Sequence, residues 1–124
     1  MAKKILVIDD EELIIKSLSR LLEKNGYEVF VAKNGQDAVI MTEEEDFDLI
    51  LADIRMPGMN GVETVEHIYK GISTKCKRKI PTIFITGYAD EMIEKKTKIL
   101  NPAAYIYKPF DTGELLDKIK KAIS

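Results

Sequence analysis

The sequence predicts an α/β fold, a doubly wound (βα)5 sandwich in which helices cover both faces of a five-stranded parallel sheet. Five short apolar runs, at 4–8, 27–32, 48–52, 82–86 and 104–108, alternate along the chain with segments of helical spacing. The runs are continuous rather than alternately polar and apolar, which is typical of parallel strands buried on both faces. Strands separated by helices join into one sheet through right-handed crossovers.

The first two helices follow from apolar spacing and from residues that favour helix ends. The first helix is expected to bury one face, made of Leu13, Ile14, Leu18, Leu21 and Leu22. Gly26 comes directly after it, where a helix C terminus favours left-handed backbone. Asn34 and Gly35 open a second helix, which carries Val39 and Ile40.

The remaining three helices are predicted in the same way. The third carries Val62, Val65 and Ile68, and a weaker fourth carries Met92, Ile93 and Lys96. Asp111 can cap the fifth helix, and Glu114 three residues later can complete a capping box. Its expected buried stripe consists of Leu115, Leu116, Ile119, Ala122 and Ile123.

Length and composition restrict the class of protein. A chain of 124 residues has the size of one ordinary domain, so we expect a single domain over residues 1–124. The 19 basic and 21 acidic residues give a net charge of −2, which favours neither nucleic acid nor a membrane as a direct partner. A single cysteine, Cys76, excludes an intramolecular disulfide and indicates a reducing cytoplasm. The apolar stretch near the start is too short for a signal peptide or a membrane span.

Chemically active side chains follow four of the five predicted strands. They are Asp9 and Asp10 after the first strand, Asp53 after the third, Thr86 at the end of the fourth and Lys108 at the end of the fifth. Ligands of open parallel sheets bind outside the carboxyl ends of the strands, so we expect these side chains to meet. The second strand ends blandly at Ala32 and Lys33, as expected of an outer edge strand in the order 2-1-3-4-5.

This set of residue types indicates phosphoryl transfer. Three carboxylates at one sheet edge repel one another and need a counter-charge. Oxygen ligands without a nearby histidine or thiolate favour Mg²⁺ or Mn²⁺. Lys108 adds a mobile positive charge, and Thr86 adds a hydroxyl that can donate to an oxyanion. A carboxylate, a metal, a lysine and a hydroxyl are what phosphorylation of an aspartate requires, with Asp53 as the acceptor.

Four motifs in order give a specific resemblance. They are VIDDEE at 7–12, LADIRMPGMNG at 51–61, ITGYAD at 85–90 and YIYKPF at 105–110. On these motifs the chain resembles the response regulator receiver domains of two-component signalling, chemotaxis regulators among them, from Lys4 to Ile123. The resemblance implies a flavodoxin-like fold, and the strand order 2-1-3-4-5 is the one known for that fold rather than an independent prediction.

The resemblance also implies roles for the site residues. Asp53 would accept a phosphoryl group from a histidine kinase or a histidine phosphotransferase, as in a phosphorelay. Asp10, Asp53 and the backbone carbonyl of Arg55 would ligate Mg²⁺, while Asp9 would orient a metal-bound water. Lys108 would pair with the phosphoryl oxygens. The only reactions implied are the domain's own aspartyl phosphorylation and dephosphorylation, so it would be a signalling domain and not an enzyme.

The implied output is a conformational switch. Thr86 would swing toward the phosphoryl group, and Tyr105, at the family's switch position, would turn from exposed to inward. This would bias the surface formed by the fourth helix, the fifth strand and the fifth helix toward a downstream protein target, which the sequence does not identify. A phosphorylation-dependent homodimer through the fourth and fifth helices stays open. A Lys108–Pro109 peptide bond in the cis form is a further implication.

Two positions bear on how long the phosphoryl group lasts. Arg55 stands two residues after Asp53, and Tyr88 stands two residues after Thr86. In relatives these positions influence the access of water to the phosphoryl group. We therefore expect a long-lived phosphoaspartate.

Several alternatives remain open. Asp9 and Asp10 could cap the first helix, and Tyr105 could only pack in the sheet. An aspartate-based Mg²⁺ phosphatase would carry its nucleophile on the first strand with a second aspartate two residues later, but Asp9 is followed there by Glu11. The chain could also be the receiver part of a longer regulator. The basic stretch Lys75–Lys79 is either a nucleic-acid patch or a solvated loop.

Overall fold

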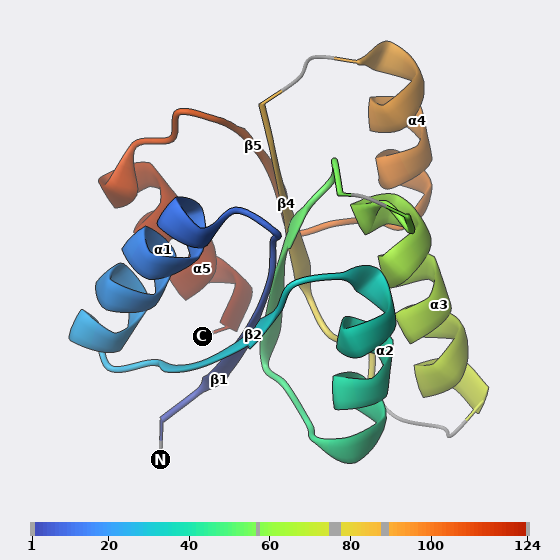
Figure 1. Cartoon of the computed structure of the whole chain (residues 1–124), viewed down its shortest axis with the longest axis horizontal. Helices are drawn as coiled ribbons and strands as arrows, with labels where there is room; N and C mark the ends of the chain where they lie inside the picture. The colour runs from blue at the N-terminus through green and yellow to red at the C-terminus, as the bar shows by residue number, and fades with distance from the viewer. Residues whose placement is uncertain (1, 57, 75–77, 88–89, 124) are drawn as a thin grey trace.

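Five parallel strands form one sheet in the predicted order β2-β1-β3-β4-β5 (Figure 1). The strands are β1 (Lys4–Ile8), β2 (Glu28–Ala32), β3 (Leu49–Asp53), β4 (Thr82–Thr86) and β5 (Ala104–Tyr107). The helices are α1 (Glu12–Lys24), α2 (Gly35–Glu44), α3 (Gly61–Thr74), α4 (Glu91–Ile99) and α5 (Thr112–Ile123). This computed structural model describes residues 2–56, 58–74, 78–87 and 90–123.

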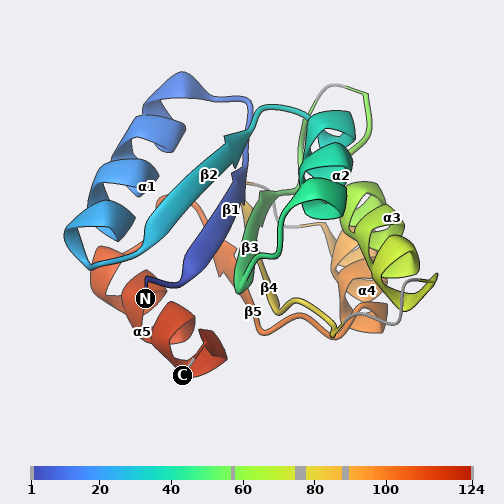
Figure 2. The same cartoon turned by 90° about the horizontal axis from the view of Figure 1, so that it is seen from below.

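The helices form two layers around the sheet. Helices α1 and α5 cover one face, and α2, α3 and α4 cover the other (Figures 1 and 2). Because successive side chains of a strand point to opposite faces, each strand contributes to both halves of the core. In β1, Ile5 and Val7 pack on the α1 and α5 side, whereas Leu6 and Ile8 pack on the α2, α3 and α4 side. The doubly wound fold is therefore confirmed.

The expected buried face of α1 is wrong at its first residue. Leu13 is 79% exposed, and the buried residues of the helix are Ile15, Leu18 and Leu22. At about 100° per residue, Leu13 lies on the side of the helix opposite Leu22. The other predicted residues of this face, Ile14 and Leu21, are partly buried against the same half of the core.

Side-chain caps fix the start of α2, α4 and α5. The Asn34 side chain accepts a hydrogen bond from the backbone N–H of Asp37 at the start of α2. Asp90 accepts from two N–H groups in the first turn of α4. Asp111 Oδ1 accepts from the N–H of Glu114 at 3.1 Å, which confirms the predicted cap of α5.

The sheet register brings the functional strand ends to one edge. Ile8 pairs with Ala32, Asp53 pairs with Ile85, and Thr86 pairs with Tyr107. The carboxyl ends of β1, β3, β4 and β5 therefore lie side by side. No helix in the described ranges is long and apolar enough to cross a membrane.

Candidate functional site

Three carboxylates converge at the carboxyl edge of the sheet, as predicted. Asp9 follows β1 directly, Asp10 is the next residue, and Asp53 is the last residue of β3. Each contributes one oxygen to a group whose members lie within 4.8 Å of one another. Asp9 is 2% exposed and Asp53 is 5% exposed, whereas Asp10 is exposed to solvent. Two acids are thus held in the interior, and the third lies at the rim.

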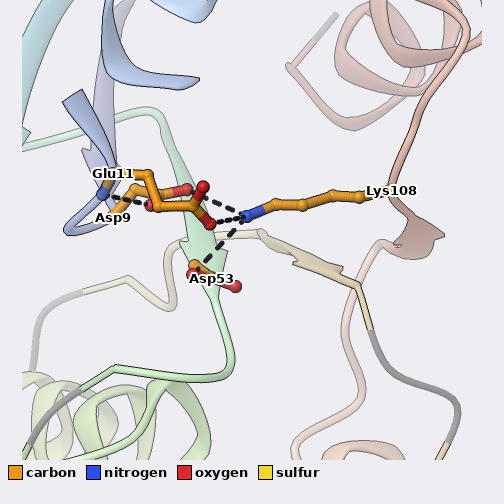
Figure 3. A network of polar contacts seen from close by, with 4 residues as sticks. All are labelled: Asp9, Glu11, Asp53 and Lys108. Carbon is orange, nitrogen blue, oxygen red and sulfur yellow. Dashed lines mark hydrogen bonds and ion pairs between the residues drawn. The ribbon is translucent and has the colours of Figure 1, made fainter. Parts of the chain in front are cut away.

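Lys108 reaches into this group from the end of β5 (Figure 3). Its Nζ lies 3.4 Å from Asp9 Oδ2, 3.5 Å from Asp53 Oδ2 and 3.3 Å from Glu11 Oε1. The backbone N–H of Lys108 donates to the carbonyl oxygen of Thr86 at 2.7 Å, which extends the β4–β5 pairing up to the lysine. The Lys108–Pro109 peptide bond is cis, as implied.

Glu11 is a site residue that sequence reasoning missed. Its carboxylate pairs with Lys108, and its backbone N–H donates to Asp9 Oδ1 at 2.9 Å. Glu11 is also the N-cap residue of α1, and its side chain makes no capping bond. Asp9 and Asp10 therefore do not occupy the cap position. The sequence signal for Glu11 was its place as the third acidic residue of the VIDDEE motif, because a residue at the start of α1 lies close to the end of β1.

The burial of the site sets its electrostatics. Burial and the neighbouring Asp9 carboxylate raise the pKa of Asp53 from 3.8 to about 6, although Lys108 acts in the opposite direction. Burial also raises the pKa of Asp9, against the Glu11 N–H bond and Lys108. Burial disfavours the Lys108 ammonium, but the carboxylates of Asp53, Asp9 and Glu11 outweigh it and raise the pKa of Lys108. The single positive charge of Lys108 therefore does not fully compensate the negative charges of these carboxylates.

Thr86 and Tyr105 lie on the β4 and β5 side of the site. Thr86 is 1% exposed, one residue beyond the partner of Asp53 in the sheet. Tyr105 is partly buried against the core half that contains α4, and its ring meets Tyr107 edge to face at 5.3 Å. Its hydroxyl oxygen is enclosed and has no hydrogen-bond partner among the described residues. Burial, together with the charges of Glu94 and Asp90, raises the pKa of Tyr105.

The loop after Asp53 is held by the start of α3. The Gly61 N–H donates to the carbonyl oxygen of Ile54 at 2.9 Å. Asn60 and Glu63 form a capping box, each side chain accepting from the backbone N–H of the other residue. The helix thereby fixes the backbone that leaves the acceptor aspartate.

Two of the sequence predictions concern Arg55 and Tyr88, the residues expected to shield the phosphoryl group. Arg55 is exposed to solvent. Tyr88, the second predicted shielding residue, lies outside the described residues, as do Cys76 and most of the basic stretch 75–79.

The donor chemistry fits a hard divalent cation. The converging ligand atoms of Asp9, Asp10 and Asp53 are carboxylate oxygens, which suit Mg²⁺ and Mn²⁺. Burial, followed by the Asp9 carboxylate, raises the pKa of Asp53, so its negative charge is disfavoured in the protein alone. A cation held by these three residues would compensate that charge and could bind phosphate oxygens.

The Asp53 charge should destabilise the metal-free protein at neutral pH. The folded pKa of about 6 exceeds the reference value of 3.8, so the cost appears as pH rises past 4 and is complete above 6. The shift corresponds to on the order of 3 kcal/mol. With metal chelated, Asp53→Asn is therefore expected to raise the free energy of unfolding at pH 8 and to have little effect at pH 3.5. Urea unfolding at both pH values measures this, and a variant no more stable than the wild type at pH 8 would contradict it.

Comparison with known proteins agrees with this geometry. A family model described as the response regulator receiver domain matches residues 5–120. Transcriptional regulatory protein CrdR of Helicobacter pylori is 38% identical over 121 residues, which make up 98% of this chain and 55% of that protein. The chain thus spans about half the length of this curated relative.

Solved structures give the same result for the fold. A CheY-like receiver domain protein of Methanospirillum hungatei matches with a TM-score of 0.90 and 34% identity, over 99% of this chain and 94% of that one. Chemotaxis protein CheY4 of Vibrio cholerae matches with a TM-score of 0.87 and 27% identity, over 98% and 99% of the two chains.

Proposed function

Since this chain belongs to the response regulator receiver domains of two-component signalling, which are signalling domains rather than classical enzymes, we propose that a phosphoryl group on Asp53 switches it. The observation that carries the proposal is the pairing of Lys108 Nζ with Asp53 Oδ2 at 3.5 Å inside a nearly buried group of carboxylates. A buried carboxylate whose pKa is raised beside a lysine and two other acids is a candidate functional group, which supports Asp53 as the acceptor.

The proposed reaction uses the residues in distinct roles. One Asp53 oxygen bonds to phosphorus while the phosphorus–nitrogen bond of a phosphohistidine breaks, and the electron pair returns to the imidazole. Lys108 is proposed to pair with the phosphoryl oxygens in place of its present carboxylate partners, and Thr86 to donate its hydroxyl to one of them. Attack of water on phosphorus then regenerates Asp53 and releases phosphate.

The proposed cofactor is Mg²⁺, with Mn²⁺ as a substitute. Asp10, Asp53 and the backbone carbonyl of Arg55 would ligate it, and Asp9 would orient a bound water. Receiver domains generally bind Mg²⁺, and the three carboxylates of this chain lie close enough together to hold one ion. The ion would neutralise negative charge on the transferred group. The carboxylates cannot do this, because they are negatively charged themselves.

The proposed output is a shift in the α4, β5 and α5 surface. Thr86 moves toward the phosphoryl group. Tyr105 was expected to start from an exposed position but is already partly buried, so its proposed movement is further inward. The enclosed and unpartnered hydroxyl of Tyr105 supports two competing positions for this ring, because a buried polar atom without a partner makes the present position costly. Reversing a 1:99 population takes about 5.5 kcal/mol, so we expect partial activation.

The cost of the Tyr105 hydroxyl can be measured directly. Tyr105→Phe removes an enclosed oxygen that has no partner among the described residues, so we expect it to leave stability unchanged or raise it by up to about 1 kcal/mol. Tyr69→Phe is the matched control, since the Tyr69 hydroxyl bonds the Ile80 carbonyl at 2.9 Å and Thr82 Oγ1 at 2.7 Å. It should cost about 1–3 kcal/mol. Equal losses in urea unfolding would contradict the assignment.

The domain organisation, the location and the partners of the chain are also proposed. We propose that residues 1–124 form a single receiver domain that acts in the cytoplasm, with a histidine kinase or histidine phosphotransferase as donor and a protein as downstream target. Neither nucleic acid nor a membrane is proposed as a direct partner. A phosphorylation-dependent homodimer stays open. The length of the relative CrdR supports a second arrangement, in which a receiver is joined to a separate effector domain.

Phosphotransfer profiling tests the proposed function. Purified protein is mixed with each radiolabelled histidine kinase of the source organism, with Mg²⁺ present, and label on the chain is followed over seconds to minutes. We expect rapid, stoichiometric labelling by one or a few kinases. Absence of labelling by every kinase, together with many turnovers of p-nitrophenyl phosphate, would instead support the phosphatase alternative.

A further inference from the structure

Lys108 has three acidic partners, and Glu11 differs from the other two (Figure 3). Asp9 and Asp53 are nearly buried, whereas the Glu11 side chain is 60% exposed. Among the residues that the structure describes, the acids whose oxygens could together hold one metal ion are Asp9, Asp10 and Asp53. Glu11 is therefore the partner of Lys108 that lies at the rim, outside the expected ligands of the cation.

The Lys108 ammonium lies between its partners and is not bound tightly to any of them. Its Nζ is 3.3 Å from an oxygen of Glu11, 3.4 Å from one of Asp9 and 3.5 Å from one of Asp53. A hydrogen bond between an ammonium and a carboxylate is typically about 2.7–2.9 Å long. Since a flexible four-carbon stem carries the ammonium, Lys108 can shorten one of these contacts and lengthen another without a movement of the backbone.

A divalent cation would compete with Lys108 for Asp9 and Asp53. Both carboxylates belong to the group that could hold the ion, and both now pair with the lysine. Two positive charges that share the same ligands repel each other strongly over a few ångströms. Binding of the ion therefore drives the ammonium away from Asp53, toward another anionic partner. Glu11, already 3.3 Å from Nζ and outside the ligand group, is that partner.

We propose that Glu11 is a positioning residue that holds Lys108 at the rim of the site while a divalent cation occupies the three aspartates. The inference rests on the proposed function, because it presupposes that the ion binds there, and it adds a role for a residue that is not a ligand. With Glu11 present, the withdrawn ammonium keeps an ion pair, so the cation binds more tightly. Lys108 also stays at the mouth of the site, from which it can pair with an arriving phosphoryl group.

The side chain of Glu11 can be changed without removing a structural contact of the helix. Glu11 is the N-cap residue of α1, but its side chain makes no capping bond. The hydrogen bond to Asp9 Oδ1 comes from the backbone N–H of Glu11, so a substitution of the side chain leaves the donor in place. Glu11→Gln therefore keeps the size of the side chain and removes its negative charge.

Glu12→Gln is the matched control for Glu11→Gln. The Glu12 side chain is 61% exposed and pairs with Lys33 instead of Lys108. Each variant removes one negative charge from the start of α1, so the two change the net charge and the helix end alike. Mg²⁺ affinity of the unphosphorylated full chain is measured by titration of amide chemical shifts. We expect about 3-fold weaker binding for Glu11→Gln, since an exposed ion pair is weak, and a change below about 1.5-fold for Glu12→Gln.

A double-mutant cycle with Lys108→Met separates positioning from a general effect of charge. Without the ammonium, no group has to move to a new partner when the ion binds. Glu11→Gln should therefore weaken Mg²⁺ binding less in the Lys108→Met background than in the wild type. A merely electrostatic attraction between Glu11 and the ion would produce the same loss in both backgrounds.

The pairing can also be observed in the wild type, which needs no variant to fold. Nuclear Overhauser contacts between the ε protons of Lys108 and the γ protons of Glu11 report the ion pair in solution. We expect these contacts to persist at saturating Mg²⁺, while contacts between Lys108 and the β protons of Asp53 weaken.

Three results would overturn the proposal. One is the loss of the contacts between Lys108 and Glu11 when Mg²⁺ is added. Another is an Mg²⁺ affinity of Glu11→Gln equal to that of the wild type or of Glu12→Gln. The third is an equal effect of Glu11→Gln in both backgrounds of the cycle. In each case the wild type still binds Mg²⁺ and the proposed function stands, whereas a wild type that binds no Mg²⁺ would overturn the proposed cofactor as well.

Discussion

Asp53→Asn is expected to abolish phosphorylation of the chain by acetyl phosphate in the presence of Mg²⁺, with a loss of more than about 100-fold. The amide keeps the size of the side chain but offers no anionic oxygen to bond phosphorus. Intact-mass spectrometry after a fixed incubation measures the phosphorylated fraction. Because the substitution also removes a buried charge, loss of labelling cannot be attributed to unfolding if the variant is at least as stable as the wild type.

Asp117→Asn is the matched control for this prediction. Asp117 lies on α5, is exposed, and pairs with Lys121 at 3.1 Å. An exposed pair of this kind contributes little to stability, so we expect wild-type labelling. Equal labelling of the Asp53→Asn variant and the wild type would contradict the assignment of the acceptor.

Gly61→Ala is expected to destabilise the protein and to displace Asp53, whereas Gly71→Ala on the same helix is expected to stabilise it. A Cβ on Gly61 would lie 2.2 Å from the backbone carbonyl oxygen of Asp53, which cannot move without shifting the acceptor itself. A Cβ on Gly71 would meet nothing within 4 Å. We expect a loss of about 1–3 kcal/mol for Gly61→Ala and a gain of about 0.5–1 kcal/mol for Gly71→Ala.

Urea unfolding followed by circular dichroism measures both glycine variants, and the labelling assay measures the displacement of Asp53. Opposite shifts of the two unfolding midpoints, with slower phosphorylation only in Gly61→Ala, are the expected result. Midpoints that move in the same direction would show that the close approach to Asp53 does not control this turn.

The fold could be predicted from sequence because its signals are local. Each strand is a short apolar run, and β3 and β4 are buried along their whole length. The starts of helices could also be predicted where a side chain caps them, as at Asn34 and Asp111. Spacing was less reliable within α1, where Leu13 and Ile15 are both apolar and only packing against the sheet decides which is buried.

The candidate site was predictable in its members but not in its contacts. The positions of Asp9, Asp53 and Lys108 at strand ends predicted that they belong to the site, because parallel strands place their carboxyl ends at one edge of the sheet. The sequence could not distinguish buried Asp9 from exposed Asp10, since the two are adjacent and chemically identical. It also could not show that Lys108 would reach a third acid.

Two further features of the structure depend on the packing of distant segments. The close approach of Gly61 to Asp53 requires the turn between β3 and α3 to be built before it can be seen. A hollow of about 780 Å³ between α3 and α4 is present because the side chains of these two helices do not fill the space between them. Neither is encoded in any short stretch of residues.

The claim that Asp53 carries the phosphoryl group is tested most directly by locating the modified residue. The chain is phosphorylated with acetyl phosphate and Mg²⁺, reduced with borohydride so that an acyl phosphate becomes homoserine, and digested for peptide sequencing by mass spectrometry. We predict homoserine at position 53 and at no other aspartate. Homoserine at position 9 or 10 instead, or a phosphate that survives borohydride because it is not an acyl phosphate, would contradict the account.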